Sequence, residues 1–216
     1  MKSNRIIGTM ALTGLALALT GCIVTSVYPF YFEKDVVFEP VLLGDWTKGQ
    51  APEEHWKFER DAETAYRITR ESGGKTTVFK GHAFKLRGRT FLDLSTMDRK
   101  ADIQPEPVPS HFLARVVQLT PTLKLSAINY DWLKELLAKD PNAVRHIVIQ
   151  TGEKPDDRRI ILTADTTELQ QFLLKHLKTE GPLVYQPGEG WQHRNTEGMW
   201  EPSVELQPGP ARSPSR

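Results

Sequence analysis

Short segments in which apolar and polar residues alternate recur through the middle of the chain and constrain its fold most strongly. Trp56 and Phe58 alternate with charged residues, and Tyr66 and Ile68 repeat the pattern in the next segment. Period-two alternation is typical of strands with one buried and one solvated face. About eight such segments, separated by turn signals such as the paired glycines at 73–74, predict a mainly β protein with an antiparallel closed barrel or a sandwich.

Two segments have helical periodicity instead. The first begins near Asp131 and ends before Pro141. The second begins near Asp165, where either Asp165 or Thr166 can cap the helix, and its apolar residues between 169 and 177 fall on one face. We therefore expect two short helices beside the strands, and the second of them is the better specified.

The first 22 residues have the layout of a secretory signal peptide. Lys2 and Arg5 precede an uncharged apolar run, which is followed by small residues and then Cys22. The run is shorter than the ~20 residues that a membrane-spanning helix needs. Residues 19–22, Leu-Thr-Gly-Cys, resemble the lipobox of bacterial lipoproteins. This resemblance implies cleavage before Cys22, a diacylglyceryl group on its thiol and acylation of the new amino end.

The residue after the lipidated cysteine influences sorting in bacteria with two membranes. Here it is Ile23 and not aspartate, which by analogy with lipoproteins implies release to the outer membrane, facing the periplasm. We expect a chain organised as a signal peptide (1–21), an aromatic segment (22–40), a β-barrel domain (41–200) and a disordered tail (201–216). The aromatic segment either packs along the domain as a strap or lies in the headgroup layer. Its interspersed charges favour the strap.

The strand and helix order also resembles that of lipocalins. Gly44 and Trp46 match the Gly-x-Trp of the lipocalin first strand, and the late helix is followed by a short last strand at Leu183–Gln186. The resemblance implies an up-and-down barrel with a C-terminal helix outside and Trp46 at the barrel floor. The Thr-Asp-Tyr element of lipocalins is missing, and the helix near Asp131 interrupts the strands.

A family of uncharacterised bacterial lipoproteins is a better match over most of the mature chain. The chain shares with it the Tyr-Pro-Phe-Tyr start at 28–31, the Leu-Leu-Gly-x-Trp strand at 42–46 and the helix at 167–174. This resemblance implies the same lipocalin-like barrel and an envelope location. It implies no activity and no catalytic residues.

A small barrel can hold one apolar ligand in its interior, and a membrane anchor would place it among lipids. Bulky strand residues are the candidates to line or fill that interior, namely Trp46, Trp56, Phe58, Tyr66, Ile68, Phe79, Phe84, Phe91 and Phe112. The same residues could pack the barrel solid. The protein would then be a non-enzymatic interaction protein that supports envelope assembly through its surface.

Other function classes find little support. A formal net charge of +1 gives no electrostatic footprint for nucleic acid. The single cysteine leaves no thiol for catalysis once it is lipidated, and the six histidines lack helical metal-binding spacing. A site shared by His82 and His111 from separate strands is the open alternative for a metal. We predict no enzyme activity, no cofactor and no metal, and we leave the protein partner undefined.

Overall fold

The computed structural model describes residues 24–48, 51–97, 110–153, 158–177, 183–186, 190–193 and 204–209. Its strands and helices, in chain order, are β1 (Thr25–Ser26), η1 (Glu33–Asp35), β2 (Val36–Val37), η2 (Pro40–Leu42), β3 (Gly44–Lys48), β4 (Ala51–Arg60), β5 (Ala65–Ser72), β6 (Lys75–Leu86), β7 (Arg89–Thr96), β8 (His111–Gln118), β9 (Leu123–Ala127), α1 (Tyr130–Lys139), β10 (His146–Gln150), β11 (Arg158–Leu162), α2 (Thr166–His176), β12 (Leu183–Gln186), β13 (Gly190–His193) and β14 (Val204–Pro208). Both η elements are single turns of 3-10 helix.

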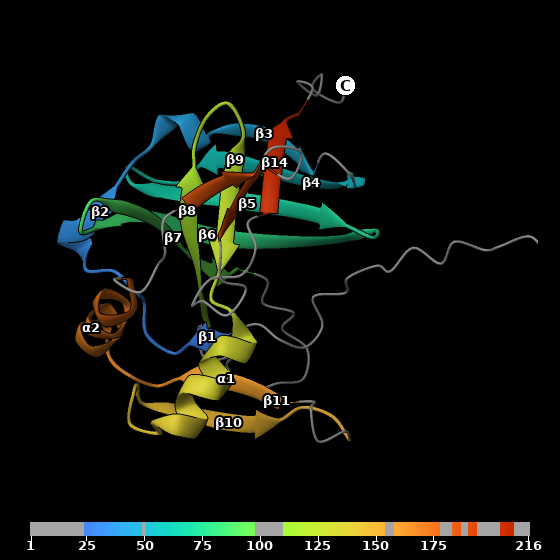
Figure 1. The fold of residues 1–216 in the computed structure, drawn as a ribbon. Coiled ribbons are helices and arrows are strands. Elements are labelled where there is room, and N and C mark those ends of the chain that lie inside the picture. Colours follow the sequence, from blue (N-terminus) through green and yellow to red (C-terminus); the bar gives the residue numbers. More distant parts are fainter. Residues whose placement is uncertain are drawn as a thin grey trace, which may run out of the picture.

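Eight antiparallel strands close into a barrel (Figure 1). Strands β3 to β8 each pair with the next strand along the chain. Strand β14 then pairs with both β9 and β3 and joins the two edges. Full closure leaves no unpaired edge in the barrel. The prediction of a mainly β protein with an antiparallel barrel is confirmed.

The closing strand is not the one that the sequence predicted. Leu183–Gln186 pairs with β13 in a separate two-stranded sheet, whereas Val204–Pro208 completes the barrel. The prediction of a disordered tail over 201–216 is therefore wrong for Val204–Pro208. Leu206, fully buried, inserts into the interior cluster and stabilises this strand. Pro208 lies at its end, where a missing N–H costs least.

Tight turns join the central strands as their sequences require. Gly73 and Gly74 have φ angles of 56° and 73° in the β5–β6 turn, and Arg87 and Gly88 have φ angles of 51° and 75° in the β6–β7 turn. Two consecutive positive φ angles are typical of the hairpin turn whose twist matches that of the flanking strands. The turn signals at 73–74 and at Gly88 thus fix the register of three long strands.

Residues 24–39 form an ordered segment along the outside of the barrel, which we call the strap. Its β1 pairs with β8 and, in parallel, with β11. Its β2 pairs with β6 beyond the point where β5 begins, with Val36 opposite Phe84. This is the packed arrangement that the interspersed charges favoured over a segment in the headgroup layer.

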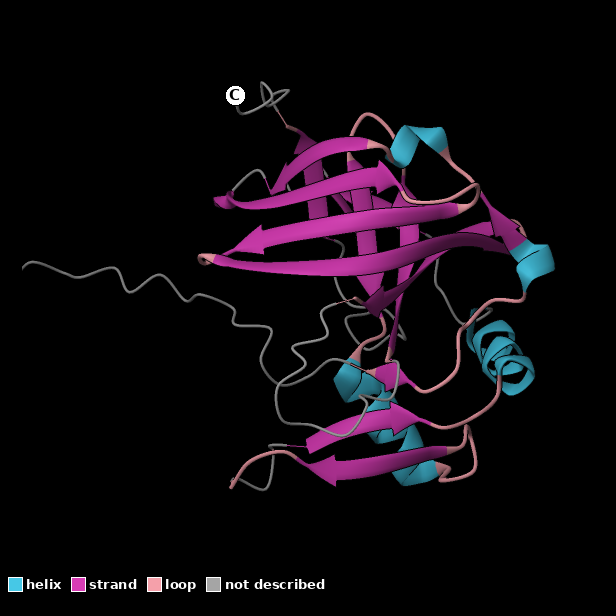
Figure 2. Ribbon diagram, turned by 180° about the vertical axis from the view of Figure 1, so that it is seen from behind, coloured by secondary structure: helices cyan, strands magenta, loops and turns pink. Residues whose placement is uncertain are grey.

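Helices α1 and α2 and the hairpin β10–β11 form a second layer below the barrel (Figures 1 and 2). The hairpin β10–β11 joins β1 in one sheet, and α1 and α2 pack with it against the barrel's outer face. The side chains of Asn129 and Asp165 accept hydrogen bonds from backbone N–H groups in the first turns of α1 and α2, as N-caps do. The predicted helix outside the barrel is confirmed.

Two apolar cores result from this arrangement. The buried residues of one core come from all eight barrel strands, so this core fills the barrel interior. The other joins the strap, α1, α2 and β11 to the outer face of β6, β7 and β8. The middle barrel strands are therefore apolar on both faces.

Candidate functional site

One end of the barrel is closed by the strap and η2. The indole Nε1 of Trp46 donates a hydrogen bond to the Leu42 carbonyl at 3.0 Å, and both residues are buried. Phe38 stacks on Tyr66 with 4.9 Å between ring centres. The Tyr66 hydroxyl accepts from the Glu39 N–H at 2.6 Å and donates to the Glu39 carbonyl at 3.2 Å. This end is the floor, and burial raises the pKa of the Tyr66 hydroxyl.

The layer above the floor is tightly packed. Gly81 lies opposite Tyr66 in the β5–β6 pair, on the inward face of β6. A Cβ atom on Gly81 would lie 2.6 Å from Cδ1 of Ile68, which is fully buried. Even a methyl group would therefore force its neighbours to move. The barrel is filled at this level.

Three aromatic side chains at the other end are only half buried. Trp56, Phe79 and Phe112 come from β4, β6 and β8 and pack against the interior cluster. The Trp56 and Phe79 rings stack with centres 6.4 Å apart, and Phe112 meets Phe79 edge to face at 6.4 Å. We call these three residues the aromatic mouth. It offers apolar surface to a ligand where the rest of the barrel does not.

Charged side chains border the aromatic mouth. The guanidinium of Arg70 lies 5.4 Å from the centre of the Trp56 ring and 3.0 Å from Oε1 of Glu54. Trp56 Nε1 donates to the same oxygen at 3.2 Å, and Lys48 Nζ lies 3.8 Å from Oε2. Two cations thus share one carboxylate, so these three described side chains together carry one excess positive charge.

The residues predicted to line the barrel fall into three groups. Trp46, Phe58, Tyr66 and Ile68 fill the interior, whereas Trp56, Phe79 and Phe112 form the aromatic mouth. For Phe84 and Phe91 the prediction is wrong. They stack on each other outside the barrel, with ring centres 5.3 Å apart, in the core beneath the strap. The inward positions of their strands belong to Ala83 and Leu92, which no sequence signal distinguishes because both faces of these strands are covered.

Sequence reasoning also missed the rim. Arg70 follows Tyr66 and Ile68 at the inward parity of β5, so alternation places its side chain inside the barrel. This alternation was the sequence signal that could have predicted an inward Arg70. An arginine at the end of an alternating strand is usually solvated, so the signal was not used. The partner that holds it, Glu54, became visible only in the folded barrel.

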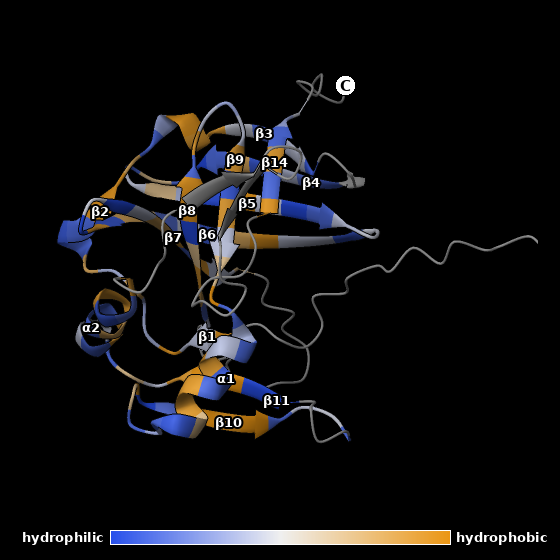
Figure 3. Ribbon diagram, viewed as in Figure 1, coloured by the Kyte–Doolittle hydropathy of each residue, from blue (hydrophilic) through white to orange (hydrophobic). Residues whose placement is uncertain are grey.

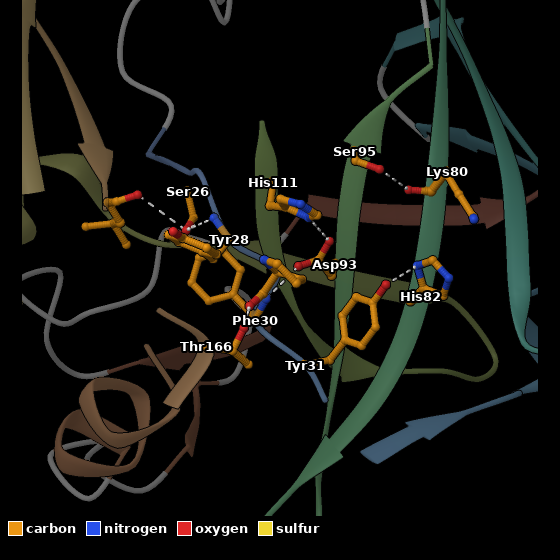
Figure 4. Close-up of polar contacts among 12 residues, drawn as sticks. Ser26, Tyr28, Phe30, Tyr31, Lys80, His82, Asp93, Ser95, His111 and Thr166 are labelled. Atoms are coloured by element: carbon orange, nitrogen blue, oxygen red, sulfur yellow. Dashed lines mark hydrogen bonds and ion pairs between the residues drawn. The ribbon is translucent and has the colours of Figure 1, made fainter. Parts of the chain in front are cut away.

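A buried polar cluster fixes the strap to the barrel (Figure 4). Asp93, on the outer face of β7, is 1% exposed. Its Oδ2 accepts the backbone N–H of Phe30 at 2.9 Å, and its Oδ1 lies 2.7 Å from Nδ1 of His111. Buried carboxylates persist when each oxygen has a hydrogen-bond partner. The cluster therefore holds the strap in place.

Tyr31 and His82 extend this cluster. The Tyr31 hydroxyl lies 3.0 Å from Nδ1 of His82, and burial raises the pKa of Tyr31 to about 12. Burial lowers the pKa of His82, and the nearby Lys80 lowers it further. Both side chains are consequently neutral at neutral pH. Their geometry supports a structural hydrogen bond beneath the strap.

Ser26, also in the strap, makes its hydrogen bonds to β11 and within the strap, not to this cluster. Ser26 Oγ donates to the Leu162 carbonyl at 3.4 Å and accepts from the Tyr28 N–H at 3.2 Å. Ser26 is 1% exposed and lies within the sheet that contains β1. The arrangement stabilises the turn after β1.

Outside the barrel, a cleft of about 500 Å³ lies between α2 and the β6–β7 turn. Its lining includes Arg87, Arg89 and Lys175, so it is basic where the aromatic mouth is apolar. The Arg89 guanidinium also reaches the Leu177 carbonyl at 3.4 Å. This cleft is a surface depression and is separate from the barrel interior.

Further findings bear on metals, membranes and relatives. Among the residues that the structure describes, no group of three or more His, Cys, Asp or Glu side chains is placed to hold a metal ion. Within the same part of the chain, no helix has the length and apolar character needed to cross a membrane. Cys22, the predicted lipidation site, lies outside the described residues. Comparison with protein-family models, curated proteins and solved structures finds no match to this chain.

Proposed function

We propose that this protein is a bacterial envelope protein, held in the membrane by lipid on Cys22, whose barrel binds an apolar ligand at the aromatic mouth. The observation that carries the ligand proposal is the half-buried cluster of Trp56, Phe79 and Phe112 above a filled interior. Binding sites for small molecules combine aromatic walls with a few polar groups, and the mouth has both.

The rim and the filled interior narrow the class of ligand. Because the barrel is packed at Gly81, a ligand enters only the outer part of the barrel and leaves its remainder outside. Lys48 and Arg70 together carry one more charge than Glu54 balances. The site thus favours an amphiphile with an apolar portion against the aromatic rings and an acidic head at the rim.

Two observations support the anchor proposal: the sequence that ends at Cys22 and the short distance along the chain from Cys22 to the folded strap. The lipobox-like residues 19–22 end at Cys22, and the folded strap begins two residues later at Val24, which is 6% exposed. A domain that folds immediately after the lipidated residue is held close to its membrane. Ile23 favours the outer membrane, with the barrel in the periplasm.

Metabolic labelling tests the anchor. The wild-type protein, expressed in a Gram-negative bacterium with radiolabelled palmitate, is expected to incorporate label and to sediment with outer membranes. The Cys22→Ser variant is expected to lose both properties, because it lacks the thiol that carries the lipid. Tight membrane association of Cys22→Ser without incorporated label would refute the anchor.

Titration with a fluorescent fatty-acid analogue tests the mouth. We expect saturable binding that Phe79→Ala weakens about tenfold, equivalent to ~1.4 kcal/mol, since one aromatic wall is lost. Phe32→Ala is the matched control, because Phe32 is an exposed phenylalanine of the strap. Equal weakening by both variants, or by neither, would contradict binding at the mouth.

The packing at Gly81 also favours a second function, in which the barrel is a filled scaffold that supports envelope assembly through its surface. The fluorescence titration separates the two proposals. A scaffold shows no saturable binding of the analogue, and its contacts with other envelope proteins do not depend on Phe79.

A further inference from the structure

The edge strand β10 exposes three consecutive apolar side chains. Ile147, Val148 and Ile149 are 49%, 50% and 37% exposed. In the described sheet β10 pairs with β11 alone, so its other edge is open. The strand is one of the hydrophobic stretches at the bottom of the molecule in Figure 3. Soluble proteins usually protect such an edge with charges or cover it, because it invites association.

This edge lies close to the proposed anchor. The strap begins at Val24, and the first strand of the strap, β1, is the second neighbour of β10, since β11 pairs with both. Two strand spacings amount to about 10 Å. Two residues of extended chain span at most ~7 Å, so Cys22 lies within that distance of Val24. A membrane that receives the lipid of Cys22 therefore reaches this small sheet.

Basic side chains lie at the same end of the sheet. Strands β1 and β11 run parallel, so both begin at the end nearest Cys22. β11 begins with Arg158 and Arg159, and both are exposed. Cations beside an anchor are attracted to the phosphates of anionic lipids. Apolar and basic side chains thus meet on the part of the molecule that the anchor holds near the bilayer.

We propose that the β10 edge, through Ile147, Val148 and Ile149, lies in the headgroup layer of the membrane that carries the anchor. The proposal rests on the lipid anchoring proposed above. It fixes the orientation of the domain, with the sheet β1–β11–β10 against the lipid and η2, at the top of Figure 1, facing away. The competing occupant of this edge is a second copy of the chain.

Site-specific fluorescence tests the orientation. In the mature protein the thiol of Cys22 is consumed by the lipid, so Val148→Cys introduces the sole thiol and accepts one environment-sensitive nitrobenzoxadiazole label. The labelled, lipidated protein is reconstituted in phosphatidylethanolamine–phosphatidylglycerol vesicles with or without lipid that carries a spin-label quencher near the headgroup. Val41→Cys is the matched control: Val41 is an exposed valine on η2, at the opposite end of the molecule in Figure 1.

We expect the label at position 148 to shift to shorter wavelength and to be quenched severalfold more strongly than the label at position 41. Circular dichroism and thermal melting of both variants establish that each is folded. Equal, weak quenching at both positions in a protein whose mass includes the lipid refutes the orientation and leaves the anchor intact. A blue shift without quenching, together with thiol cross-linking between two copies, also refutes it and assigns the edge to self-association. A mass without lipid refutes the anchor and, with it, this inference.

Discussion

Replacement of Asp93 by alanine tests whether a buried carboxylate fixes the strap to the barrel. Asp93 accepts the Phe30 N–H and lies 2.7 Å from His111 Nδ1, and its side chain is 2% exposed. A hydrogen bond to a charged group contributes about 1.5–3 kcal/mol, and a buried donor without an acceptor costs ~1–3 kcal/mol. Loss of both acceptors should therefore lower the free energy of unfolding by about 3–5 kcal/mol.

Urea unfolding followed by tryptophan fluorescence measures this loss, in a protein that lacks residues 1–21 and carries Cys22→Ser. Asp93→Asn, which keeps the shape and one acceptor oxygen, should lose about half as much. Glu63→Ala in the exposed β4–β5 turn is the control and should stay within ~0.5 kcal/mol of the parent protein. Hydrogen exchange adds a local readout, because the Phe30 amide should lose protection in Asp93→Ala before the barrel amides do.

A loss below ~1 kcal/mol for Asp93→Ala, with the Phe30 amide still protected, would refute the reasoning. It would mean that apolar burial of the strap, and not the carboxylate, holds this segment. Phe30 itself is fully buried, so this competing contribution is real and the measured value separates the two.

Four further predictions concern the barrel and its pH dependence. Trp46→Ala should lower the free energy of unfolding by about 3–5 kcal/mol in urea unfolding, because it empties the floor, and a change below ~0.5 kcal/mol would mark a surface residue. Gly81→Ala should cost about 1–3 kcal/mol in the same assay, because its methyl group meets Ile68, and unchanged stability would show free space at this level. Burial lowers the pKa of His82, so the unfolded chain binds more protons and stability should fall as pH drops below 6.5; His82→Gln should flatten this part of the urea-midpoint profile. Burial raises the pKa of Tyr31 from 10 to about 12, so stability should fall as pH rises through that interval, and a Tyr31→Phe profile with the same alkaline slope would contradict this assignment.

Local sequence signals were sufficient for most of the barrel. Alternation located its strands, glycines located the β5–β6 and β6–β7 hairpins, and helical periodicity located both helices. Each of these signals depends only on neighbouring residues, and the local structure that it favours agrees with the final fold.

The remaining features depend on partners that are distant in the chain. Val204–Pro208 is short and lies in a Pro-rich tail. It forms a strand because it pairs with the edges of both β3 and β9, which do not pair with each other. Phe84 and Phe91 lie on strands whose two faces are both covered, so their composition could not indicate which face is inside. The buried Asp93 accepts the backbone N–H of Phe30, which lies 63 residues earlier in the chain, so local sequence could not indicate this contact.

The aromatic mouth likewise depends partly on local sequence signals and partly on contacts between residues that are distant in the chain. The sequence indicated aromatic residues on several strands, but only the pairing of β4, β6 and β8 around one barrel separates the three half-buried rings from the filled interior. The charged rim, in turn, depends on the contact between Arg70 and Glu54 across neighbouring strands.

Native mass spectrometry of the full-length gene product, extracted from bacterial membranes in mild detergent, tests the central claim most directly. The account predicts a chain that begins at Cys22, carries the covalent mass of a diacylglyceryl group and an acyl chain, and retains a non-covalent amphiphile that Phe79→Ala loses and Phe32→Ala keeps. A chain without covalent lipid would contradict the anchor. A lipidated chain with no bound amphiphile, or with one that Phe79→Ala retains in full, would contradict binding at the aromatic mouth.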